Sequence, residues 1–218
     1  MALAGLLGIA YLLGAFPTAV LVGRLVGGID IRDHGSRNAG ATNVWRVLGW
    51  RAGLVVLGVD LAKGALAAAG ISRLPLGSAG VNRDLLPLLC GLAAVLGHSF
   101  PVYTRFRGGK GVATGAGMLL AVAPVPSGIA LGVFALAVVA TGYVSLGSLL
   151  GAIAVPLAVV LLERYALARY PTPLLVLTAA FAVFLLIMHR RNLLRLIQGT
   201  ERRFPQLQVW KRLRPPTG

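Results

Sequence analysis

Long apolar runs alternate with short polar segments along the whole chain. A helix needs about 20 predominantly apolar residues to cross the hydrocarbon core of a bilayer. Runs near this length predict seven membrane-spanning helices, at about 3–23, 52–72, 84–101, 112–125, 126–143, 145–163 and 173–189. Only Pro124, Val125 and Pro126 separate the fourth run from the fifth, which are therefore either two spans joined by a tight turn or one long kinked helix.

The composition agrees with an all-α integral membrane protein. Hydrophobic residues make up 57% of the 218 residues and charged residues 12%, with a mean hydropathy of +0.82; soluble domains have about 25% charged residues. We therefore expect a single transmembrane domain over residues 1–218, with a short basic tail from about residue 190. No basic residue precedes Arg24, so we expect the first apolar run to stay as a helix and not to be cleaved as a signal peptide.

Basic residues are distributed unevenly between the two membrane faces that seven spans define. Sixteen of the 21 Lys and Arg residues lie in the segments 24–51, 105–110 and 190–214, whereas four lie on the opposite face and Lys63 lies within a span. Because Lys and Arg collect on the cytoplasmic side, this asymmetry predicts an outside N-terminus and a cytoplasmic C-terminus. The net charge of +15 then reflects this bias and attraction to anionic lipid headgroups, so we expect no nucleic-acid partner.

Three polar segments interrupt the apolar pattern, all on the predicted cytoplasmic face. They are GSRNAGATNVWRVLG at 35–49, HSFPVYTRFRGGKGVATGAG at 98–117 and HRRNLLRLIQGTE at 189–201. In the second segment, consecutive glycines let the backbone approach a phosphate while Lys110 supplies a countercharge. Gly111 stands where a nucleotide P-loop needs Ser or Thr, which disfavours a P-loop and leaves a flexible basic turn as the alternative. Together the three segments suggest one anion-binding site.

Ionisable residues near the spans are further candidates. Lys63 lies inside the second predicted span, on the same helical face as Asp60, and a charge in a span is by default functional. The alternatives are an internal pair that only ties helices together, or snorkelling of Lys63 to the surface. His34, His98 and His189 lie at predicted cytoplasmic span ends, and a structural role is favoured for His34. The six acidic residues form no cluster with metal-ligand spacing, so we expect no metal and no cofactor.

The polar segments, together with DLAKG at 60–64 and YVSLGS at 143–148, closely resemble the ordered motifs of the bacterial membrane acyl-phosphate:glycerol-3-phosphate acyltransferases. The resemblance implies transfer of a fatty acyl group from acyl phosphate to the 1-hydroxyl of glycerol 3-phosphate, giving lysophosphatidate and inorganic phosphate in the first step of phospholipid synthesis. It also implies a multi-pass protein of the bacterial cell membrane whose active site faces the cytoplasm. The enzyme that supplies acyl phosphate is a candidate partner.

The resemblance assigns roles to two groups of residues. The catalytic group is Ser36, Lys110, Ser145 and His189. The group that binds substrate and phosphate is Asn38, Thr42, Asn43, Arg46, Lys63, His98, Gly108, Gly109, Gly111 and Asn192. Two positions depart from the family pattern, which commonly has Gly where Arg37 stands and an acidic residue where Arg191 stands. Arg37 alters the loop if that position needs a positive φ, and Arg191 removes a structural carboxylate near His189.

Several mechanisms are compatible with these residues. Acyl phosphate is already activated, so positioning and charge stabilisation suffice for direct attack by the glycerol 3-phosphate hydroxyl, with His189 or the donor phosphate taking its proton. A covalent alternative uses Ser36 or Ser145 as nucleophile. Other glycerol phosphate acyltransferases carry a His followed by four residues and an Asp, but the positions five after the three histidines are Ala39, Tyr103 and Leu194.

Two other classes of protein are alternatives to the acyltransferase. A transporter or channel for a phosphorylated metabolite is compatible with short spans that contain Gly and Pro. It is disfavoured because all polar segments lie on one face and the chain has no matching halves. A metal-dependent lipid phosphotransferase would need clustered Asp residues, which the sequence lacks.

Overall fold

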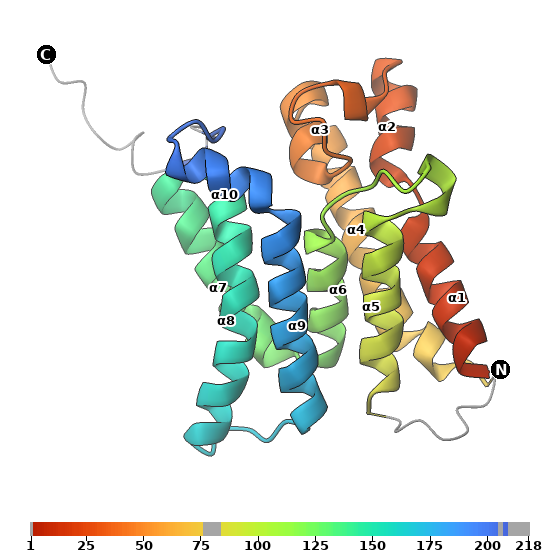
Figure 1. Cartoon of the computed structure of the whole chain (residues 1–218), viewed down its shortest axis with the longest axis vertical. Coiled ribbons are helices and arrows are strands. Elements are labelled where there is room, and N and C mark those ends of the chain that lie inside the picture. Colours follow the sequence, from red (N-terminus) through yellow and green to blue (C-terminus); the bar gives the residue numbers. More distant parts are fainter. Residues whose placement is uncertain (1, 76–83, 205–206, 209–218) are drawn as a thin grey trace, which may run out of the picture. The chain divides into compact units, whose positions relative to one another are not determined.

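The computed structural model describes residues 2–75, 84–204 and 207–208, and every regular element in these ranges is a helix (Figure 1). The chain forms two compact units, Met1–Pro124 and Val125–Gly218, and each is described by itself. Arg83, which belongs to the charge distribution above, and the end of the basic tail, 209–218, lie outside the described residues.

The first unit is built from six α-helices and three short 3-10 helices in its described residues. They are α1 (Ala2–Ala15), α2 (Thr18–Gly27), η1 (Ile31–Asp33), α3 (Ala41–Leu48), α4 (Trp50–Ala69), η2 (Ile71–Arg73), α5 (Leu86–Ser99), η3 (Val102–Thr104) and α6 (Val112–Val122). Helix α4 packs against α3, α5 and α6, and α1 packs against α5. The α4 and α6 backbones approach closely, because a Cβ on Gly64 would collide with the Thr114 carbonyl and one on Gly117 with that of Leu61.

The first predicted span, 3–23, is not one continuous helix. Helix α1 ends at Ala15 and α2 begins at Thr18, with Pro17 between them. Proline has no N–H and its ring crowds the preceding turn, so it interrupts the helical hydrogen bonds at this point. Non-helical backbone at membrane depth is tolerated only where protein surrounds it, and the Phe16 carbonyl accordingly finds an internal partner, described below.

The second unit contains α7 (Pro124–Thr141), α8 (Val144–Arg164), α9 (Thr172–Met188) and α10 (Arg190–Ile197). Helix α8 packs against α9, and α10 is bent by 63° from α9 at His189. The segment after α10 returns to the turn between α7 and α8, where the Phe204 N–H donates to the Gly142 carbonyl over 2.8 Å. This return brings the end of the described chain to the N-terminus of α8.

Helices are present at all seven places where the apolar pattern predicted spans, but not all are long enough to cross a membrane alone. Among the described residues, five stretches meet that requirement: Ala2–Gly27, Trp50–Arg73, Leu86–Thr104, Pro124–Thr141 and Val144–Arg164. The bent pair of α9 and α10 makes a sixth if it counts as one span. Helix α6 has 11 residues and rises roughly 16 Å. The integral membrane class is confirmed, whereas the count of seven and the orientation of the termini stay predictions.

Candidate functional site

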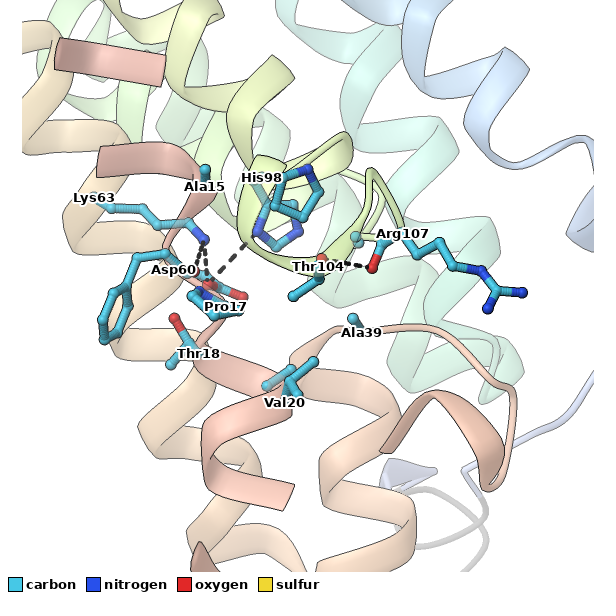
Figure 2. Close-up of a pocket in the computed structure, with 15 residues that line it drawn as sticks. Ala15, Pro17, Thr18, Val20, Ala39, Asp60, Lys63, His98, Thr104 and Arg107 are labelled. Carbon is cyan, nitrogen blue, oxygen red and sulfur yellow. Dashed lines mark hydrogen bonds and ion pairs between the residues drawn. The ribbon is translucent and has the colours of Figure 1, made fainter. Parts of the chain in front are cut away.

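Three ionisable side chains meet inside the first unit, where α4 faces the end of α5 (Figure 2). Asp60, Lys63 and His98 are 2%, 3% and 8% exposed. Lys63 Nζ lies 2.9 Å from Asp60 Oδ1, and His98 Nδ1 lies 3.6 Å from the same oxygen. The internal pair considered for Lys63 is therefore present. Its burial excludes snorkelling to the surface.

The break in the first span gives Lys63 a second partner. Lys63 Nζ donates to the Phe16 carbonyl over 3.3 Å. This carbonyl follows the C-terminal end of α1, where the helix dipole places partial negative charge that favours a cation. A buried charge without such partners would cost several kcal/mol. The pairing by position in α4 was readable from the sequence, whereas the contact across 47 residues was not.

A small cavity, partly open to solvent, adjoins this cluster. The break between α1 and α2 forms one wall, and parts of the first two polar segments, including Ala39 and Gly109, form the other (Figure 2). Thr18 Oγ1 lines this cavity, and it is a buried oxygen with no hydrogen-bond partner among the described residues. The Thr18 hydroxyl is therefore able to form a hydrogen bond with a ligand in the cavity beside the charged cluster.

The glycine loop, residues 108–111, folds against His98. The Gly109 N–H donates to the His98 carbonyl over 3.1 Å. A Cβ on Gly109 would collide with His98 Nε2 and approach the Ala39 carbonyl within 2.7 Å. Gly108 is equally confined, because its Cβ would collide with the His98 carbonyl. The structure thus explains these two glycines by close packing on the protein itself, a reason that the sequence analysis did not anticipate.

The last two residues of the loop lead into α6. Gly111 occupies the N-cap position with φ +84°, a left-handed conformation that favours glycine. Lys110 precedes it and is half-buried. The N–H groups of a first helical turn carry partial positive charge and attract anions. A lysine next to a helix N-terminus therefore forms a cationic end to the loop.

The first polar segment is held in shape by Asn43. This residue is 1% exposed, and its Oδ1 accepts the Ser36 N–H over 2.8 Å. Its Nδ2 donates to the carbonyls of Ile31 and His34, both over 3.0 Å. The side chain predicted to bind substrate thus makes three hydrogen bonds to its own loop. Ser36 is exposed, and the other predicted residues of the segment are half-buried: Asn38, Thr42 and Arg46.

Arg37 adopts φ +58°, so the position where the family commonly has glycine does have a left-handed backbone. The condition set for this departure, a positive φ, is therefore present, and its effect on the loop stays a prediction. His34, in turn, is exposed, and its Nδ1 lies 3.0 Å from the Asp30 carbonyl, which agrees with a structural role.

Arg32 connects the turn that precedes the first polar segment to the second polar segment. Arg32 Nη2 lies 2.6 Å from Asp30 Oδ2, and Arg32 Nη1 donates to the Thr104 carbonyl over 3.2 Å. The hydrogen bonds from Arg32 lower the pKa of Asp30 to about 2, so its carboxylate is ionised at neutral pH. This bridge fixes the loop before α3 to the loop before α6.

Two of the predicted residues in the second unit meet at a carboxylate that was not predicted from the sequence. Glu201 Oε1 accepts hydrogen bonds from Ser145 Oγ over 2.8 Å and from Asn192 Nδ2 over 2.6 Å. Glu201 Oε2 accepts from Arg195 Nε over 2.6 Å. Glu201 is the only acidic residue after Glu163 in the sequence, a signal that could have marked it. Arg191 is exposed on α10, so the buried carboxylate of this cluster comes from Glu201.

The contacts in the second unit determine the pKa of Glu201 and the tautomer of His189. Burial raises the pKa of Glu201, but hydrogen bonds from Arg195, Asn192 and Ser145 outweigh it and hold the pKa below its ordinary value. His189 is 2% exposed at the bend before α10, with Nδ1 2.9 Å from the Leu185 carbonyl. Only a protonated Nδ1 can donate there, which makes Nε2 the unprotonated nitrogen of the neutral ring.

Comparison with known proteins supplies the family. The sequence model of the family described as Glycerol-3-phosphate acyltransferase matches residues 4–199. The chain belongs to the glycerol-3-phosphate acyltransferase family. The acyltransferase named Glycerol-3-phosphate acyltransferase from Chlorobaculum tepidum is 43% identical over 89% of this chain and 93% of its own length. One of the same name from Salinibacter ruber is 42% identical over 88% of each chain.

A solved acyltransferase shares the fold. The crystal structure of PlsY, an integral membrane glycerol 3-phosphate acyltransferase, in its glycerol 3-phosphate form, matches with a TM-score of 0.82. The match has 34% sequence identity and covers 96% of this chain and 99% of PlsY. The lysophosphatidic acid form of PlsY matches with a TM-score of 0.80. The expected family and the integral membrane fold are thereby confirmed.

Proposed function

We propose that this acyltransferase takes its acyl group from acyl phosphate, transfers it to the 1-hydroxyl of glycerol 3-phosphate, and releases lysophosphatidate and inorganic phosphate. The family membership supplies the acceptor. The observation that carries the rest is the cationic end of the glycine loop, where Lys110 precedes the N-terminus of α6. Gly108 and Gly109 of the same loop line the cavity beside the buried cluster. The solved forms of PlsY with glycerol 3-phosphate and with lysophosphatidic acid support the same acceptor and product.

The glycine loop holds one substrate phosphate in this proposal. Lys110 supplies a full positive charge and the first N–H groups of α6 supply partial charges, which together suit a phosphate dianion. Gly111 lets the chain turn into the helix with φ +84°. From the first polar segment, Ser36, Asn38, Thr42 and Arg46 supply further donors to phosphate or glycerol oxygens, and Asn43 holds their loop through its backbone contacts.

The chemical step is direct transfer. The 1-hydroxyl oxygen forms the ester bond to the acyl carbon, the bond from that carbon to the phosphate oxygen breaks, and phosphate leaves with the bonding electrons. His189 Nε2 takes the hydroxyl proton, because the contact of Nδ1 with Leu185 leaves Nε2 as the basic nitrogen. Ser145 keeps its place in the catalytic group and Asn192 its place in the group that binds substrate, and Glu201 orients both side chains.

The surroundings of the reaction belong to the same proposal. The charge asymmetry supports polar segments on the cytoplasmic face of a bacterial cell membrane, with the N-terminus outside. A soluble acceptor then arrives from the cytoplasm, and an amphiphilic donor arrives from the bilayer or from the enzyme that makes it.

The donor is tested by supplying purified protein with labelled glycerol 3-phosphate and either acyl phosphate or acyl-CoA. Product with acyl phosphate alone is the expected result. Product with acyl-CoA alone would overturn the donor but keep the family activity. Absence of product with both donors, from protein shown to be folded, would overturn the proposed function.

A further inference from the structure

We propose that Asp60 is a positioning residue that acts through His98 on the glycine loop, and that Lys63 holds Asp60 in place and does not bind substrate phosphate. The inference rests on the proposed function in one respect, since that function assigns a substrate phosphate to the loop. It changes the expected role of Lys63 and gives Asp60 a role that the sequence analysis left open.

The His98 ring lies between the buried carboxylate and the loop. On one side, Nδ1 lies 3.6 Å from Asp60 Oδ1. On the other side, Nε2 lies so close to Gly109 that a Cβ there would collide with it. The His98 carbonyl also accepts the Gly109 N–H over 3.1 Å. One residue therefore contacts the loop through its ring and its backbone, and Asp60 sets the orientation of that ring.

Lys63 is committed to this arrangement by its own contacts. Its Nζ lies 2.9 Å from Asp60 Oδ1 and donates to the Phe16 carbonyl over 3.3 Å. Because the carboxylate compensates its charge and the side chain is 3% exposed, Lys63 is poorly placed to neutralise a phosphate. Lys110 lies in the glycine loop itself, next to the N-terminus of α6.

A purely structural pair would tie α4 to the end of α5 without affecting the loop. The two roles differ in what they change. Loss of a structural tie lowers the stability of the fold and leaves the affinity for phosphorylated ligands unchanged. Loss of positioning leaves a folded protein whose loop binds its phosphate more weakly.

The experiment compares two double variants of the full chain in detergent, Asp60→Leu with Lys63→Met and Asp60→Asn with Lys63→Met. Both remove the two buried charges together, because removing one alone would leave the other uncompensated, and apolar replacement of a buried pair is often tolerated. The asparagine variant keeps an uncharged side-chain oxygen at the position that faces His98 Nδ1. The leucine variant does not. Their difference therefore isolates the contact between residue 60 and His98.

Dissociation constants for glycerol 3-phosphate and for inorganic phosphate are measured by titration calorimetry. The leucine variant is expected to bind one of the two probes about tenfold more weakly, a change of about 1.4 kcal/mol. The asparagine variant is expected to bind that probe within about threefold of the wild type, about half as large a change in free energy. Gly109→Ala should weaken the same probe, because the added Cβ pushes the loop from His98. Glu163→Gln, an exposed carboxylate in α8, is the control and should change neither constant.

Two results would overturn the inference. One is a folded leucine variant that binds both probes as the wild type does; the other is an asparagine variant as weak as the leucine variant. If the leucine variant does not fold, His98→Asn takes its place, since it keeps a donor toward Asp60 but removes the ring from Gly109. Wild-type affinity in that folded variant would equally contradict the proposal. Neither probe requires an acyl donor, so an error in the donor assignment leaves this test intact.

Discussion

Ser145 and Glu201 are separated by 56 residues, yet the Ser145 hydroxyl donates to Glu201 Oε1 over 2.8 Å. This contact joins the N-terminus of α8 to the segment that follows α10. The same carboxylate receives Asn192 and Arg195. Glu201 thus connects two residues with predicted roles in the reaction to a third that balances its charge.

Glu201→Gln should lower the stability of the second unit. The substitution keeps the size of the side chain but leaves Arg195 without its ionic partner and replaces an accepting oxygen by a donor. We expect a loss of roughly 1–3 kcal/mol, the usual cost of leaving buried polar groups unsatisfied. Thermal unfolding in detergent measures it, with Glu163→Gln as the matched control. Equal unfolding temperatures for the two variants would contradict the structural role.

The contribution of Glu201 should depend on pH in a defined direction. Its pKa in the folded protein lies below the ordinary value of 4.5. The unfolded chain therefore takes up a proton first as the pH falls, so the stabilisation is fully present above that value and is lost as the pH falls through the folded pKa. We expect the difference in unfolding temperature between wild type and Glu201→Gln to be constant from pH 7 to 6 and to shrink below about 4.5. A difference that grows on acidification would be the wrong sign.

Arg37→Gly should stabilise the first polar segment. A left-handed backbone costs a residue with a Cβ roughly 1–2 kcal/mol, and glycine escapes this cost while adding some entropy to the unfolded chain. The net expected gain is about 1 kcal/mol relative to Arg37→Ala, which removes the same charge but keeps the Cβ. The comparison of these two variants by thermal unfolding separates backbone strain from charge. If alanine is as stable as glycine, φ at this position is not under strain.

Lys110→Ala should reduce kcat/KM by about 100-fold or more, because it removes the full charge that the loop offers to a phosphate. Arg105→Gln is a suitable control, since Arg105 is exposed in the same polar segment and outside the glycine loop. Steady-state kinetics with each substrate varied in turn gives the comparison. Near-normal activity of Lys110→Ala would remove the proposed role of this residue.

The parts of the fold that follow from local pattern were readable from the sequence. The apolar runs located the long helices, and the spacing of Asp60 and Lys63 placed both on one face of α4, where they pair. Contacts between distant segments were not readable. Nothing local shows that His98 meets Asp60 or that Glu201 meets Ser145, because these depend on how helices pack.

Pro17 shows a different kind of limit. Proline is a known helix breaker and is visible in the sequence. The apolar run that contains it is nevertheless long enough to predict an unbroken span. Hydropathy measures compatibility with lipid and does not record whether a backbone carbonyl finds a donor. Gly108 and Gly109 were predicted to let the backbone approach a phosphate. Their close packing on His98 is seen only in the three-dimensional structure.

The break at Pro17 also has an evolutionary consequence. Lys63 Nζ donates a hydrogen bond to the Phe16 carbonyl at the break that Pro17 makes in the first span. Pro17 and Lys63 therefore depend on each other structurally. A descendant that restored a continuous helix at position 17 would withdraw a partner from Lys63, and one that lost Lys63 would leave the Phe16 carbonyl with the Thr18 N–H as its remaining donor. We expect the two positions, 46 residues apart in the sequence, to change together or not at all.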